Sequence, residues 1–252
     1  MNNIKHIFKK EVSSYFNSPM AYIFLVIFAI VNSFFFTNIF FKINQSDLRT
    51  LFNIIPLVYL FFIPAICMGL IAKEKNTGTM EVLTTLPITD RQLVIGKFLS
   101  ALFLIFVGLL FTFIQLYTLI QTGTDIDYGA IFTGYLGLLL LGAVYSSIGI
   151  FASSVSNDQI VAFIIGVFLV LIFYLMDKTI LLFTPPFMAS FIQYLAVDYH
   201  LTNISRGVID SRNIIYFLSI IYLNYDFKIW TTRLLKESSI QKVFQKLVFN
   251  IC

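Results

Sequence analysis

Charged residues are scarce in this chain. Asp, Glu, Lys and Arg make up 12% of its 252 residues, whereas soluble domains contain about 25%. A water-soluble globule of this size could not cover its surface with so few charges. The composition therefore excludes a soluble enzyme, a disordered tail and a nucleic-acid-binding domain.

Cysteine is also rare, and the familiar motifs of catalysis are missing. Cys67 and Cys252 are too few and too far apart for a disulfide framework. The sequence has no Gly-x-x-x-x-Gly-Lys-Ser/Thr loop to hold nucleotide phosphates, and no Gly-x-Ser-x-Gly or His-Glu-x-x-His pattern. His6 and His200 lie on opposite predicted faces, which favours surface positions without chemistry over a metal site. We therefore expect no catalytic residue, no metal and no cofactor bound by the chain itself.

Long uncharged hydrophobic stretches dominate instead. Hydrophobic residues account for 58% of the chain, which contains 29 Phe. A helix needs about 20 mostly apolar residues to cross a bilayer, and these stretches do not alternate as the strands of a membrane barrel do. We predict an all-α membrane protein with about six transmembrane helices. The predicted spans cover residues 20–41, 51–71, 98–120, 131–152, 159–176 and 213–230.

The sixth span has two competing positions. The uncharged run 213–225 is 13 residues long, so a crossing there must extend through two charged residues. The rival run 179–197 contains Pro185–Pro186, and a double proline removes backbone donors that lipid cannot replace. We therefore place the span at the former position and expect 179–212 to be an outer loop with short interfacial helices.

Basic residues are distributed unevenly between the two predicted faces. With the N-terminus inside, twelve Lys and Arg lie on the inner face and five on the outer face, as the positive-inside rule requires. We therefore expect a multi-pass protein of the bacterial inner membrane with both chain ends in the cytoplasm. The inner set is Lys5, Lys9, Lys10, Lys73, Lys75, Arg91, Lys97, Lys228, Arg233, Lys236, Lys242 and Lys246, and the outer set is Lys42, Arg49, Lys178, Arg206 and Arg212.

The N-terminal segment has the periodicity of an amphipathic helix. No small-x-small cleavage site follows it, so we do not expect a signal peptide. We predict a helix in the inner membrane interface, with Ser18 capping the first span and Pro19 in its first position. A simple basic anchor is the alternative interpretation. The apolar face comprises Ile4, Ile7, Phe8, Val12, Tyr15 and Phe16, opposite Lys5, Lys9 and Lys10.

The hydrophilic stretch 72–97, between the second and third spans, predicts a helix-turn-helix elbow at the cytoplasmic surface. Gly78 permits a turn, and Thr79 can then cap a short helix that Pro87 ends. Thr89 and Gln92 form a capping box for a second helix, which runs on into the third span. A plain structural connector is the competing interpretation. The short helix has an apolar edge of Met80, Leu83 and Leu86, with Glu81 in its first turn.

The elbow motif reads Glu74-x-x-x-Gly78-Thr79-Met80-Glu81-x-Leu83-x-Thr85-x-Pro87-Ile88-Thr89, followed by Gly96-Lys97. It closely resembles the cytoplasmic elbow of the ABC-2 type transporter permeases. Within that family the chain is similar to the gliding-motility-associated ABC transporter permeases of Bacteroidota, over about residues 1–223. The end of the chain departs from the family, so we predict a permease domain at 1–230 and a divergent basic amphipathic tail at 231–252.

The resemblance implies that the elbow contacts a separate ATP-hydrolysing subunit. We then expect the chain to be the permease subunit of an exporter, with an ABC ATP-binding subunit that uses the ATP. A second permease copy or a paralogous membrane subunit is the other expected partner. Two alternatives stay open. A secondary transporter or channel usually has an ionisable residue inside its spans, which the first five predicted spans lack, and a structural anchor of a motility or secretion machine transports nothing. The expected coupling residues are Glu74, Gly78, Thr79, Met80, Glu81, Leu83, Leu86 and Pro87.

Small residues line one face of the fourth predicted span and recur in the fifth. Such stripes let helix backbones approach closely. Packing within one subunit and a subunit–subunit seam around a transport pathway are both compatible with the pattern. The residues are Gly142, Ser146, Gly149 and Ser153, followed by Ala162 and Gly166.

Overall fold

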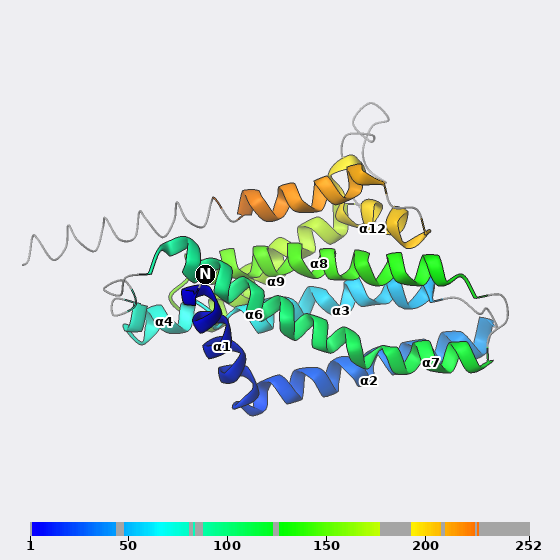
Figure 1. Ribbon diagram of the computed structural model, residues 1–252, viewed down its shortest axis with the longest axis horizontal. Helices are drawn as coiled ribbons and strands as arrows, with labels where there is room; N and C mark the ends of the chain where they lie inside the picture. The colour runs from blue at the N-terminus through cyan, green and yellow to red at the C-terminus, as the bar shows by residue number, and fades with distance from the viewer. Residues whose placement is uncertain are drawn as a thin grey trace, which may run out of the picture.

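The computed structural model describes residues 2–43, 48–80, 83, 88–122, 126–176, 193–207, 210–224 and 226. In that part of the chain every regular element is a helix and no strand occurs, which confirms the predicted all-α class. The helices are α1 (Asn2–Phe16), α2 (Pro19–Ile43), α3 (Arg49–Cys67), α4 (Ala72–Asn76), α6 (Asp90–Phe111), α7 (Phe113–Thr122), α8 (Tyr128–Val155), α9 (Gln159–Leu175) and α12 (Val197–Ser205), followed by a helix over 211–224. Figure 1 shows the long helices running along one axis, with α4 near one end of the molecule and α12 near the other.

Four helical stretches are long and apolar enough to cross a membrane, and they match the first four predicted spans: Pro19–Asn38, Leu51–Asn76, Asp90–Thr122 and Tyr128–Val155. α9 matches the fifth predicted span and is shorter, at 17 residues. The predicted sixth span is described only in part, as the helix over 211–224. The described residues therefore form a multi-pass membrane protein, and the count of six stays a prediction.

The third span is broken into two helices at Thr112. The Thr112 hydroxyl lies 2.7 Å from the carbonyl oxygen of Leu109 and 3.0 Å from the hydroxyl of Tyr135 on α8. Beyond the break, the Gln115 side chain donates to the hydroxyl of Ser33 at 2.8 Å and so joins α7 to α2. Hydroxyl groups that bond back to their own helix often bend it, and here the bend directs α7 alongside α2 (Figure 1).

The predicted helix starts are confirmed by their capping hydrogen bonds. α2 begins at Pro19, and the Met20 amide donates to the hydroxyl of Ser18 at 3.2 Å. α6 begins directly after Thr89, which forms a capping box with Gln92. These bonds satisfy amide groups that a helix start leaves without a partner. The local sequence therefore sets where these two helices begin.

The small-residue stripe of α8 lies against α3, α6 and α9 within this chain. A Cβ atom added to Gly149 would lie 2.8 Å from Cβ of Cys67 on α3, and one added to Gly166 would lie 3.1 Å from Cβ of Pro64. The helix backbones can approach this closely because neither position has a side chain. The remaining members of the stripe, Gly142, Ser146, Ser153 and Ala162, are buried as well.

The prediction that His200 lies on the surface is wrong. Its side chain is 1% exposed, its Nδ1 lies 2.7 Å from the amide oxygen of Asn213, and its Nε2 lies 2.9 Å from the carbonyl oxygen of Tyr194. The imidazole also stacks on the ring of Tyr216 at 3.9 Å between centroids. His200 is buried because its face of α12 packs against Tyr194 and against Asn213 and Tyr216 of the helix over 211–224. His6 is exposed, as expected.

Within the predicted outer loop, residues 193–195 and α12 are helical, in agreement with the expected short helices. The double proline 185–186 and the tail 231–252 lie outside the described residues.

Candidate functional site: the elbow and its ion cluster

The elbow begins with a tight turn after α4. Gly78 has a φ angle of +71°, in the left-handed region that glycine adopts most readily. The Thr79 hydroxyl donates back to the carbonyl oxygen of Glu74 at 3.2 Å, which closes the turn onto α4. Met80 and Leu83 follow in helical conformation and are half-buried. Three other predicted elbow residues, Glu81, Leu86 and Pro87, lie outside the described residues.

Hydrogen bonds join the first part of the elbow to the end of α8. The hydroxyl of Ser153 accepts from the backbone amides of Ile71 and Ala72, at 3.1 and 3.0 Å, and donates to the carbonyl oxygen of Met68 at 2.8 Å. The ammonium group of Lys75 donates to the carbonyl oxygen of Ser154. α4 is therefore fixed to the end of α8 by both side-chain and backbone groups.

A buried ion cluster joins α4 to α1 and α6. Nζ of Lys97 lies 2.9 Å from Oε1 of Glu11, 2.8 Å from Oε1 of Glu74 and 2.6 Å from the carbonyl oxygen of Leu70. The Lys97 side chain is 1% exposed, and those of Glu11 and Glu74 are 12% and 13% exposed. Lys10 approaches the same Glu74 oxygen at 3.5 Å. The cluster therefore contains two cations and two anions from three helices that are far apart in the sequence.

The pairing explains how an ammonium group can be buried here. A buried charge is tolerated when it is paired and hydrogen-bonded, whereas loss of one partner from such a pair costs about 3–5 kcal/mol. The three oxygen atoms around Lys97 match the three donors of its ammonium group. The cluster therefore holds α1, α4 and α6 in one arrangement, and it is a stronger constraint than exposed ion pairs would be.

Neutral contacts extend this docking along α1: Asn3 and Ile7 contact α6, and Tyr15 contacts α3. The Asn3 side chain donates to that of Gln92 at 3.3 Å. One turn later, a Cβ atom added to Gly96 would lie 2.6 Å from Cγ2 of Ile7, so only glycine lets α1 lie this close. The Tyr15 hydroxyl donates to the carbonyl oxygen of Ile66 at 3.0 Å, and burial raises its pKa well above the usual range, which keeps the donor protonated.

Two features of this site were missed by reasoning from the sequence. Lys97 was noted as a positive inner-face residue and as the end of the elbow motif, with no partner predicted for it, and Glu74 was expected to face a partner protein. In the structure Glu74 faces Lys97, and its second oxygen is buried without a hydrogen-bond partner among the described residues. The sequence does contain one indication: Glu11 is the only acidic residue among the first 18, and it is four residues from both Ile7 and Tyr15. This spacing puts it on the same helix face as these two apolar-face residues.

The sequence matches the family model of ABC-2 family transporter proteins over residues 6–208. The chain belongs to this family. The match begins in α1 and ends after α12, so it includes the elbow, the ion cluster and α8 of this ABC-2 protein. No curated protein matches the chain.

Proposed function

We propose that this ABC-2 protein is the permease subunit of an ATP-driven exporter, and that a separate ABC ATPase binds its elbow at residues 74–87. ABC-2 proteins are the transmembrane components of their transporters, which in general implies an ATP-binding partner. The mechanism requires the ATPase to move the membrane helices through a small contact at the surface. The elbow must therefore be joined firmly to the spans on both of its sides.

The observation that carries the proposal is the attachment of α4 to three membrane-associated helices at once. Glu74 binds Lys97 of α6, the same lysine binds Glu11 of α1, and Ser153 of α8 holds the backbone before α4. Displacement of α4 must either break this network or move its neighbours with it. Packed, bistable contacts of this kind are how small local shifts become rigid-body movements.

We infer from the network that the two parts of the elbow have different tasks. Glu74 is engaged inside the chain, so it serves the connection to the spans. The partner contact falls to the segment after the Gly78 turn, where Met80 and Leu83 are half-buried and the expected Glu81 and Leu86 follow. An apolar edge with an acidic residue fits a groove that is apolar with a basic rim.

The docking contact can be tested by co-purification. The permease is expressed with the ATPase that accompanies it in native membranes, and the ATPase retained on the purified permease and its ATP turnover are measured. Leu83→Asp should reduce both, because it places a charge in the apolar contact. Glu81→Lys should do the same, since reversing one charge of an interfacial pair costs about 2–5 kcal/mol.

Leu195→Asp is the matched control. Leu195 is 39% exposed near α12, at the opposite end of the molecule (Figure 1). This variant should retain the ATPase as the unmodified protein does. Undiminished retention and turnover in both elbow variants, at normal membrane levels, would contradict the docking proposal. Transport driven by an ion gradient without nucleotide would indicate a secondary transporter instead, and a complex with neither activity would indicate a structural anchor.

The finer parts of the proposal rest on resemblance. The resemblance to the gliding-motility branch of the family extends over about residues 1–223, including Ser205–Asp210, and we propose that role together with an inner-membrane location and cytoplasmic chain ends. A cysteine at position 76 should label from outside only after permeabilisation, whereas one at position 124 should label in intact cells. The reverse pattern would contradict the orientation.

A further inference from the structure

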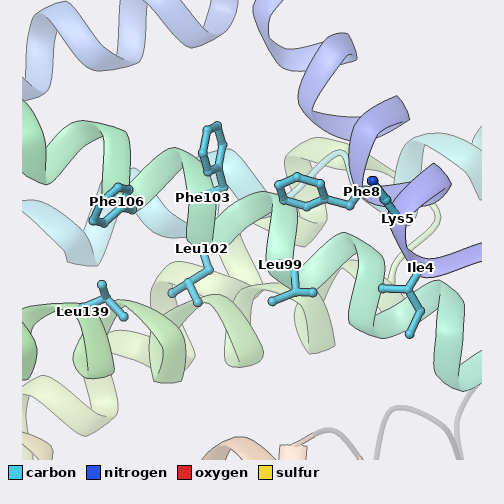
Figure 2. A pocket seen from close by; sticks show the side chains of 8 residues that line it. All are labelled: Ile4, Lys5, Phe8, Leu99, Leu102, Phe103, Phe106 and Leu139. Carbon is cyan, nitrogen blue, oxygen red and sulfur yellow. The ribbon is translucent and has the colours of Figure 1, made fainter. Parts of the chain in front are cut away.

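An apolar groove lies beside α1, apart from the elbow and the ion cluster. It has a volume of about 520 Å³, within the range of pockets that hold drug-sized ligands. Figure 2 shows its walls, which come from three helices. The lining residues are Ile4, Lys5 and Phe8 of α1, Leu99, Leu102, Phe103 and Phe106 of α6, and Leu139 of α8.

The side chains of the groove are open to the outside of the molecule. Leu99, Phe103 and Phe106 are 38%, 37% and 43% exposed. Phe8 meets Phe103 edge to face at 5.7 Å between ring centroids, which joins the wall on α1 to the wall on α6. In a protein that crosses the bilayer, such a surface beside a span lies within reach of lipid chains.

One end of the groove is cationic. Among the described residues, Lys5 is the one charged residue that lines the groove. Lys9 follows one helical turn later; both lysines are exposed, and neither forms an ion pair with another described residue. Lys10, by contrast, lies next to Glu74. Lysine side chains near a membrane interface direct their ammonium groups toward the headgroups. The ammonium groups of Lys5 and Lys9 are therefore at one end of the apolar groove.

The apolar part extends away from these cations along α6. From Leu99 to Phe106 the helix rises about 10 Å, and Figure 2 shows these residues following one another from the α1 end. A second apolar hollow of about 650 Å³, between α6–α7 and α8, shares Phe106 and Leu139 with the groove. The surface thus offers a continuous apolar path that starts at a positive charge.

We propose that this groove binds an anionic phospholipid from the leaflet in which α1 lies. The phosphate binds Lys5, and one acyl chain lies along Phe103 and Phe106. A second copy of the chain fits less well, because a symmetric contact pairs the same patch with itself and would bring the two cationic rows together. The proposal rests on membrane insertion of the chain and is independent of its coupling to an ATPase.

The test measures how close each lipid comes to the groove. The full-length permease carries Trp230→Phe, which removes its single native Trp, and Phe103→Trp as a fluorescent reporter. It is reconstituted into vesicles that contain brominated phosphatidylglycerol or brominated phosphatidylcholine, and quenching gives the relative affinity of the two lipids at position 103. We expect phosphatidylglycerol to be preferred by about fivefold, which is the contribution of one lysine near an anionic headgroup.

Three matched variants identify the source of that preference. Lys5→Gln should bring the ratio close to one, whereas Lys73→Gln should leave it unchanged, because Lys73 is exposed on α4 and does not line the groove. A reporter made by Phe168→Trp, at a 62% exposed position on α9, should show no preference. The proposal is overturned by equal quenching at position 103, by the same preference at position 168, or by a preference that survives Lys5→Gln. It is also overturned if neither lipid quenches at position 103 while both quench at position 168, since a second protein copy then covers the groove.

Discussion

Two buried polar clusters lie near opposite ends of the molecule, and they are held by different kinds of groups, charged in one and uncharged in the other. At the α4 end, Lys97 is held between Glu11 and Glu74. At the α12 end, His200 is held by an amide and a backbone carbonyl and stacks on Tyr216. The first cluster joins residues up to 86 positions apart in the sequence, and the second lies within 194–216.

The charged cluster connects helices that are distant in the sequence, whereas the His200 cluster stabilises one local segment. A charged cluster loses most of its value when one member is removed, because the remaining charges stay buried and unpaired. A cluster of hydrogen bonds and ring contacts loses only the removed group's share. We therefore expect the α4 end to respond as a unit to mutation, and the α12 end to respond residue by residue.

Lys97→Met should produce the largest loss. It leaves two carboxylates in one small site with only the exposed Lys10 beside them, at a cost of about 3–5 kcal/mol. Thermal unfolding of the purified protein in detergent should show this as a strongly lowered transition temperature. The triple variant Lys97→Met, Glu11→Gln, Glu74→Gln should recover much of the stability, because it removes all three charges. Equal stability of the single and triple variants would contradict a cooperative charged cluster.

Gly96→Val should produce the next largest loss, about 3 kcal/mol, because the added side chain overlaps that of Ile7. α1 would then separate from α6 and weaken the pairing of Glu11 with Lys97. Limited proteolysis of α1 in membrane vesicles should become faster along with the loss of thermal stability. Adding Ile7→Ala makes room for the valine and should restore part of the protection; no recovery in the double variant would mean that Gly96 matters for another reason.

The same contrast explains what the sequence could predict. The capping box at Thr89, the helix start at Pro19 and the Gly78 turn depend on neighbouring residues, and local patterns predicted them. The partners of Lys97 depend on how α1 packs across α6, which no local pattern encodes. The burial of His200 could not be predicted for another reason: the sequence around one polar residue in a helix does not show whether its face is buried or exposed.

His200→Phe should lower stability by a smaller amount, about 2 kcal/mol. The phenyl ring can still stack on Tyr216 but cannot bond Asn213 or the Tyr194 carbonyl, which stay buried without a partner. Thermal unfolding again measures the effect, and ATPase retention should be unaffected because the site is remote from the elbow. A loss as large as that of Lys97→Met would abolish the distinction between the two ends.

The smallest effects are expected at two glycines, one near each cluster. Gly78 and Gly207 have φ angles of +71° and +91°. An added Cβ would meet nothing within 4 Å at Gly78, and its nearest neighbour at Gly207 would be the Ala130 amide nitrogen at 3.5 Å. Alanine at either site should therefore cost only backbone strain, about 1 kcal/mol, and asparagine should cost less because it tolerates this conformation better.

The two glycine variants should differ in function even where they agree in stability. Gly78 sets the direction of the segment that we propose docks the ATPase, whereas Gly207 follows α12 near the other end. Gly78→Ala should thus reduce the ATPase retained on the purified permease, while Gly207→Ala should leave it unchanged at the same loss of thermal stability. If both variants retained the ATPase equally, the turn at Gly78 would serve the fold alone, and the docking surface would have to be sought elsewhere on the molecule.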